Sequence, residues 1–145
     1  GVAAYGVLAH RHQPEIEQGL GAVGPTEPRV IFTPHLVPMQ RGILSTCYVP
    51  LQAGADAATV TAILANAYAA APFIAVVENS PNTRWVVGTN RALVKPHHDD
   101  RTGTAVVLVA IDNLLKGAAG QAVQCANLML GFDETAGLPT AGWMP

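Results

Sequence analysis

The sequence predicts an α+β fold, with a mixed and largely antiparallel sheet and helices packed on one face. Stretches typical of β-strands occur in pairs separated only by turns, which favours this class over a doubly wound parallel sheet. The 145 residues are half hydrophobic, so the chain is long and apolar enough to bury a core. No repeat or change of composition marks a boundary, so we expect a single domain over residues 1–145.

Local patterns place the individual elements. β-branched and aromatic runs between turn-forming residues indicate strands, expected over residues 29–33, 42–51, 73–77, 85–89, 91–95 and 104–111. Apolar residues at helical spacing indicate helices, expected over residues 14–20, 57–70 and 118–130. Pro14 suits a first helical position, Asp56 suits an N-cap and Gly131 suits a C-terminal stop. Residues 34–38 are expected to form a loop.

Composition excludes several functional classes. The net charge is −2 and no Lys or Arg run occurs, so we expect no nucleic-acid partner. No apolar stretch reaches the roughly 20 residues that span a bilayer, so we expect no membrane partner. Cys47 and Cys125 lie far apart without metal-ligand spacing, which predicts free thiols, a reducing cytoplasmic location and no metal site. The charged fraction of only 12% suggests that a partner covers part of the surface.

The triplet His10-Arg11-His12 carries the strongest chemical signal in the residues themselves. In an extended stretch the two imidazoles point to the same face, close to Glu15 and the start of a helix. Two such rings could transfer protons near neutral pH. The competing interpretation is a structural cluster at the surface or at the helix cap, and the triplet alone leaves both open.

Other polar residues are ambiguous in the same way. His35 lies in a loop stiffened by flanking prolines and could be a site residue or a turn residue. Arg41 could bind a phosphate or carboxylate through paired hydrogen bonds, or be an ordinary surface arginine. Asp112 and Lys116 lie at a strand-to-helix junction, where ligand contacts and helix caps both occur. The polar segment 97–103 is interpreted as a solvated loop tip.

No nucleotide-binding motif is present. The glycines of Gly117-Ala118-Ala119-Gly120 have the wrong spacing for a dinucleotide fingerprint, and no phosphate-binding P-loop occurs. We therefore expect that this chain binds no nucleotide by itself.

Four blocks of the sequence together resemble one family. The segment His10-Arg11-His12-Gln13-Pro14-Glu15-Ile16 resembles the HRHxPEI segment of N-acetyl-gamma-glutamyl-phosphate reductases. Residues 30–44, 87–90 and 112–124 resemble its later blocks, in the same order. The resemblance extends over nearly the whole chain.

This resemblance implies an activity and a fold. The family uses NADPH to reduce N-acetyl-gamma-glutamyl phosphate to the semialdehyde, releasing phosphate, in arginine biosynthesis. Its chain joins a Rossmann cofactor domain, which binds most of NADP(H), to a domain like the C-terminal domain of glyceraldehyde-3-phosphate dehydrogenase. Its nucleophilic cysteine follows Pro-Gly, a context that neither Cys47 nor Cys125 has. The chain is thus expected to be the substrate-binding and dimerisation domain, inactive without the Rossmann domain.

The resemblance also implies residue roles and partners. One imidazole is the acid/base, for which we favour His12 and then His10. The expected substrate-binding residues are Tyr5, Arg11, Glu15 and Arg41. The helix expected to approach the nicotinamide carries Gln121, Gln124 and Asn127. The expected partners are the substrate, the Rossmann domain of the same enzyme and further copies of the chain, in a homodimer or tetramer.

Two alternatives remain. The first is an isolated, non-catalytic oligomerisation domain of the same fold, favoured by the missing nucleophile and fingerprint. The second is a small metal-dependent hydrolase, which would use His10, His12, His97 and His98. The hydrolase is disfavoured because no acidic ligand lies at a recognised spacing.

Overall fold

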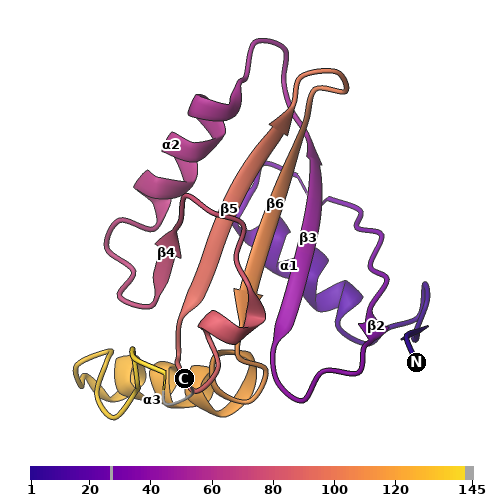
Figure 1. Cartoon of the computed structure of the whole chain (residues 1–145). Coiled ribbons are helices and arrows are strands. Elements are labelled where there is room, and N and C mark those ends of the chain that lie inside the picture. The colour runs from indigo at the N-terminus through magenta and orange to yellow at the C-terminus, as the bar shows by residue number, and fades with distance from the viewer. Residues whose placement is uncertain (27, 143–145) are drawn as a thin grey trace. The chain divides into compact units, whose positions relative to one another are not determined.

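A computed structural model describes residues 1–26 and 28–142 of the chain (Figure 1). The chain forms two compact units, Gly1–Gln40 and Arg41–Pro145. The predicted α+β class is confirmed, since helices accompany a mixed, mostly antiparallel sheet.

The first unit contains helix α1 and a short strand pair. Helix α1 spans Gln13–Val23, so the helix predicted over residues 14–20 is confirmed and longer than expected. Strands β1 (Ala3–Ala4) and β2 (His35–Leu36) pair antiparallel. The strand predicted over residues 29–33 is wrong, and β2 lies instead in the predicted loop. Within the described residues, this apolar run pairs with no strand, and the backbone N–H of Val30 donates to a side chain, Glu17 Oε1.

The second unit contains a four-stranded sheet in the order β3-β6-β5-β4. The strands span Ile43–Pro50 (β3), Ile74–Val76 (β4), Ala92–Asp99 (β5) and Thr104–Ile111 (β6). Strand β6 pairs antiparallel with both β3 and β5, whereas β4 pairs parallel with β5. Figure 1 shows the three long strands side by side.

The core of this unit is a small cluster of buried hydrophobic residues. Val86, Leu93 and Ala110 form a buried cluster. Helix α2 (Ala57–Ala67) packs on β5 and β4, leaving the edge strand β3 exposed along its whole length. The unit also contains the short 3₁₀-helix η1 (Thr83–Trp85) after β4, the π-helical segment η2 (Leu115–Ala119) after β6, and helix α3 (Gly120–Leu130).

Two predicted boundaries are wrong in this unit. Trp85 ends η1 and residues 86–88 form a turn rather than a strand. The side chains of Val86 and Val87 are buried there, and Gly88 has a positive φ of 76°, which does not fit an extended strand. Strand β5 runs on through His97 and His98, where a solvated loop was expected. Pairing with β6 draws both histidines into the sheet, and the His98 side chain is only 7% exposed.

The last helix begins differently from the prediction. A π-helical segment, Leu115–Ala119, directly precedes α3 (Gly120–Leu130). The N–H groups of Gly117 and Ala119 donate five residues back, to the carbonyls of Asp112 and Leu114. Such wide turns occur often at functional sites. Gly131 ends α3 with φ 73°, as predicted.

The predicted N-cap of α2 leads to a stability test. Asp56 Oδ1 accepts hydrogen bonds from the backbone N–H (2.7 Å) and hydroxyl (2.6 Å) of Thr59. We expect Asp56→Ala to lower Tm by roughly 3–5 °C, because the first turn loses its cap. The control is Glu78→Ala, at an exposed carboxylate after β4. Equal melting temperatures for the two variants in thermal unfolding would contradict the capping role.

Candidate functional site

The first unit brings the histidines of the triplet together with two aromatic rings. His12 is the N-cap residue of α1, and its ring centroid lies 5.0 Å from that of His10. The His10 ring also meets Tyr5 at 5.4 Å and Phe32 at 5.2 Å, all edge-on. Sequence reasoning missed Phe32, whose only signal was its place in the second family-like block.

Hydrogen bonding assigns a tautomer to His10. The backbone N–H of His12 donates to His10 Nδ1 at 3.2 Å, so the neutral ring carries its proton on Nε2. Gly6 lies against this ring with φ +56°, and a Cβ there would sit 3.0 Å from His10 Cδ2. The ring is therefore held by its neighbours and presents an N–H donor at Nε2.

Arg11 and Glu15 are exposed in the same unit, with Glu15 in the first turn of α1. Within the described residues, neither side chain has a hydrogen bond or ion pair that fixes it. Both charges are therefore available to a ligand, as a substrate-binding role would require.

Arg41 has a different environment from the one expected of a free substrate-binding residue. Its Nη2 donates to both carboxylate oxygens of Asp112, at 2.9 and 2.7 Å. The Arg41 side chain is 28% exposed, whereas the Asp112 side chain is fully buried. The arginine thus ties the start of β3 to the end of β6.

Asp112 joins three segments of the second unit. Besides Arg41, it accepts hydrogen bonds from the backbone N–H groups of Gly88, Leu114 and Leu115, at 2.8, 2.8 and 3.0 Å. Burial by itself would raise the pKa of Asp112. The hydrogen bonds from Arg41 and the three amides outweigh burial and lower this pKa below its ordinary value. Asp112 is therefore an ionised structural group, which fits the helix-cap interpretation of this junction.

A second polar network holds helix α3. Gln124 Oε1 accepts from Asn90 Nδ2 (2.9 Å) and Lys116 Nζ (2.7 Å), and Gln124 Nε2 donates to Glu134 Oε1 (2.6 Å). Asn127 Nδ2 donates to the carbonyls of Glu134 and Ala136. Desolvation lowers the pKa of Lys116, and the Glu134 carboxylate opposes this shift. The side-chain amides of Gln124 and Asn127 therefore already have hydrogen-bond partners within the second unit.

Helix α3 buries polar residues and exposes apolar ones, the reverse of the usual amphipathic pattern. Its buried positions are Gly120, Gln124 and Asn127, whereas apolar side chains lie outside. The exposed apolar residues on and just after this helix are Val123, Leu128, Met129, Leu130 and Phe132. Several exposed apolar residues on one helix are typical of a surface that a partner covers. Gln121 is half-buried, and its Nε2 donates to Cys125 Sγ at 3.4 Å.

The environment of Cys47 does not suit a nucleophile. Neighbouring atoms desolvate the Cys47 thiol and raise its pKa, the reverse of what an attacking thiolate needs. Among residues 1–26 and 28–142, no three His, Cys, Asp or Glu side chains come together to hold a metal ion. No helix in these same residues is long and apolar enough to span a bilayer.

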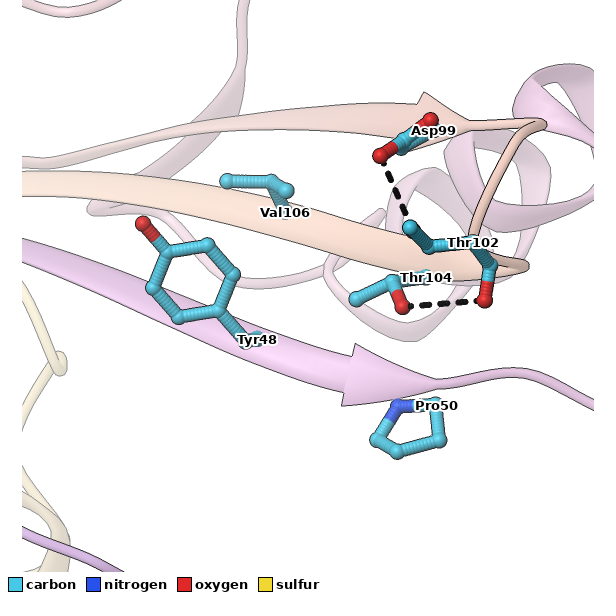
Figure 2. A pocket seen from close by; sticks show the side chains of 6 residues that line it. All are labelled: Tyr48, Pro50, Asp99, Thr102, Thr104 and Val106. Atoms are coloured by element: carbon cyan, nitrogen blue, oxygen red, sulfur yellow. Dashed lines mark hydrogen bonds between the residues drawn. The ribbon is translucent and has the colours of Figure 1, made fainter.

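One open hollow lies on the sheet itself. Figure 2 shows the side chains that line it, which come from β3, β6 and the β5–β6 hairpin. The hollow has a volume of about 420 Å³. The lining residues are Tyr48, Pro50, Asp99, Thr102, Thr104 and Val106. The Thr102 hydroxyl donates to Asp99 Oδ2 at 2.9 Å, so the one carboxylate here is already bound by its own hairpin. The hollow offers no catalytic arrangement.

Curated relatives match the chain along almost its whole length. It is 49% identical to the N-acetyl-gamma-glutamyl-phosphate reductase of Picosynechococcus sp., over 99% of this chain and 42% of that protein. It is 52% identical to the reductase of the same name from Rhodospirillum rubrum, over 95% of this chain and 40% of that protein. The chain therefore spans about two fifths of the length of these relatives.

A solved structure and a family model agree with the observed fold. The aspartate semialdehyde dehydrogenase II of Vibrio cholerae superposes with a TM-score of 0.67 at 24% identity, over 83% of this chain and 37% of that one. This likeness confirms the dehydrogenase-type C-terminal fold that the resemblance implied. The model of the semialdehyde dehydrogenase dimerisation domain matches residues 1–113. The family resemblance is thereby confirmed, and the chain belongs to the semialdehyde dehydrogenase family, of which it contains the dimerisation domain.

Proposed function

We propose that this chain is the C-terminal substrate-binding and dimerisation part of an NADPH-dependent reductase. The reductase converts N-acetyl-gamma-glutamyl phosphate into N-acetylglutamate semialdehyde and phosphate, a step of arginine biosynthesis. The observation that carries the proposal is the His10–His12 ring pair, in a chain about half identical to reductases of that name. The nucleophilic cysteine comes from the part of the enzyme that this chain does not contain.

The residues of the first unit divide the chemistry among them. His12 is the acid/base that exchanges protons with the reacting thiol and with the oxygen of the reduced carbon. His10, with its proton on Nε2, is the second candidate and a donor beside it. Tyr5, Arg11 and Glu15 bind and orient the substrate. Arg41 of the second unit remains a candidate substrate-binding residue, although its guanidinium already binds Asp112.

NADP(H) supplies the hydride when bound, mainly by the Rossmann domain of the complete enzyme. The observed inversion of α3 supports this arrangement, because its exposed apolar face needs a covering partner. Gln121, which is half-buried and donates only to Cys125 Sγ, is the amide that we propose contacts the cofactor. Gln124 and Asn127 contribute by holding the helix in shape, since their amides are bound internally.

The partners of the complete protein follow from the same proposal. The chain contains a dimerisation domain, and its strand β3 is exposed along its length, which supports a homodimer or tetramer formed through the sheet. The two free cysteines are compatible with a reducing compartment, which supports the proposed cytoplasmic location. A non-catalytic oligomerisation domain is the second candidate, since this chain lacks the Pro-Gly-Cys nucleophile.

The test is kinetic and uses a hybrid enzyme. This chain replaces the matching 42% of the Picosynechococcus reductase, and semialdehyde- and phosphate-dependent NADP⁺ reduction is measured. We expect the chain alone to be inactive and the hybrid to be active. His12→Ala should lower kcat by about 10²–10⁴-fold, the usual contribution of a general acid or base.

The matched control is His97→Ala, at an exposed imidazole of β5 that binds Ser80. It should leave turnover unchanged. Near-normal turnover in both His10→Ala and His12→Ala would remove the acid/base proposal. An inactive but folded hybrid would favour the oligomerisation domain, and activity of the chain alone would require mutation of Cys47 and Cys125.

A further inference from the structure

We propose that Phe32 is a positioning residue that, together with Tyr5, fixes the orientation of the His10 imidazole in the site. This inference deepens the proposed function and rests on it. It concerns a residue to which neither the sequence patterns nor the proposed chemistry gives a role.

The geometry around His10 is that of an aromatic enclosure. The rings of Tyr5, His12 and Phe32 approach it at 5.4, 5.0 and 5.2 Å, with interplanar angles of 71°, 71° and 78°. Edge-to-face contacts at such distances are the preferred arrangement of aromatic pairs. Because three rings surround it, rotation of the His10 ring about its Cβ–Cγ bond would disturb all three contacts.

Phe32 lies in an irregular segment that is fastened on both sides. Before it, the N–H of Val30 donates to Glu17 Oε1 of helix α1 at 2.8 Å. After it, the carbonyl of Pro34 accepts from the N–H of Tyr5 at 3.1 Å. Phe32 is therefore carried by a backbone tied to the helix and to the segment of Tyr5, which is what a positioning side chain requires.

Of the two adjacent hydrophobic residues Ile31 and Phe32, only Phe32 packs against the imidazole. Phe32 is half-buried, whereas Ile31 is 85% exposed. The two hydrophobic residues thus provide a matched pair, one in contact with the imidazole and one directed to solvent. Substitution at either changes apolar bulk on the same segment.

The packing around His10 decides the direction in which its free ring nitrogen points. His10 Nδ1 is taken by the His12 amide, so Nε2 is the only ring nitrogen left for a substrate. The direction of Nε2 depends on the ring plane that Phe32 and Tyr5 maintain. A misplacement of about 1 Å in a reacting group can lower a rate by about a hundredfold.

The first experiment reads the ring directly, in the 145-residue chain by NMR. Imidazole ring-proton shifts of His10 are compared in the parent, Phe32→Leu and Ile31→Ala, with circular dichroism to confirm folding. We expect Phe32→Leu to move the His10 signals, through loss of the ring current, and to broaden them. Ile31→Ala should leave them in place. Unchanged His10 signals in folded Phe32→Leu would overturn the inference.

The second experiment uses the active hybrid enzyme. Phe32→Leu should lower kcat by about tenfold to a hundredfold and change KM by less than about threefold, because orientation rather than binding is lost. Phe32→Tyr and Phe32→Trp should restore most of kcat, and Ile31→Ala should match the parent.

The outcomes distinguish failure of the positioning role of Phe32 from failure of the proposed reductase function. Full turnover in Phe32→Leu, with loss of turnover in His10→Ala, would overturn the positioning role and leave the proposed function intact. Full turnover in both histidine variants would overturn the proposed function, and the NMR shifts would still decide whether Phe32 orients His10. A uniform loss in Phe32→Leu, Phe32→Tyr and Phe32→Trp would overturn the positioning role, because an aromatic ring would not suffice.

Discussion

Asp112→Ala is expected to cost about 3–5 kcal/mol of unfolding free energy, the usual cost of breaking a buried ion pair. The Asp112 side chain is fully buried and accepts five hydrogen bonds, two from Arg41 and three from backbone amides. Without the carboxylate, the partly buried guanidinium of Arg41 loses its counter-charge. The amides of Gly88, Leu114 and Leu115 lose their acceptor at the same time.

Urea unfolding followed by circular dichroism measures this cost. Glu78→Ala is the control, because this exposed carboxylate has no hydrogen bond or ion pair within the described residues and should change stability little. A loss below about 1 kcal/mol in Asp112→Ala would refute the structural role, since a single ordinary hydrogen bond is worth that much.

The same carboxylate gives a pH dependence with a defined sign. Hydrogen bonds lower the folded-state pKa of Asp112 below 3.8, the ordinary value that the unfolded chain retains. Its contribution is therefore complete above the unfolded-state pKa and is lost as pH falls through the folded-state pKa. The stability difference between the parent and Asp112→Asn should thus be largest near neutral pH and shrink in acid.

Gly120→Ala is expected to destabilise the second unit by about 2–3 kcal/mol, the cost of overpacking a tight contact. A Cβ at this position would lie 2.3 Å from Asn90 Oδ1 and 2.9 Å from the carbonyl of Leu115. The backbone of the π-helical turn and the buried Asn90 would both have to move. The same change would ordinarily stabilise a helix interior, by roughly 0.5–1 kcal/mol.

Gly19→Ala in α1 is the matched control, because a Cβ there would meet nothing within 4 Å. It should raise the free energy of unfolding, so the two glycine variants should move in opposite directions. Calorimetry or urea unfolding of the two variants decides the matter. A Gly120→Ala chain as stable as the parent would show that α3 does not pack tightly against Asn90.

The site could be foreseen in part. The triplet at residues 10–12 left proton transfer and a structural cluster both open, and the family resemblance favoured proton transfer. The structure shows that the His10 and His12 rings lie together, and their roles stay predictions. Phe32 could not be found in this way, because its contact with His10 joins segments about twenty residues apart and depends on how an irregular stretch is fastened. The sequence also could not predict the ion pair of Arg41, since its partner Asp112 lies 71 residues away.

Local chemistry was enough for the elements whose signals lie within a few residues. The β-branched run of residues 104–111, the Asp56 cap and the Gly131 stop each express a preference of their own backbone, and all three are confirmed. Pairing and burial decided the remainder. Residues 29–33 have strand-forming side chains but pair with no strand in the part of the chain that the structure describes, whereas His97 and His98 become strand because β6 lies beside them. The polarity of α3 is inverted for the same reason: which face of a helix is buried depends on the surface it meets, and its own periodicity does not specify that surface.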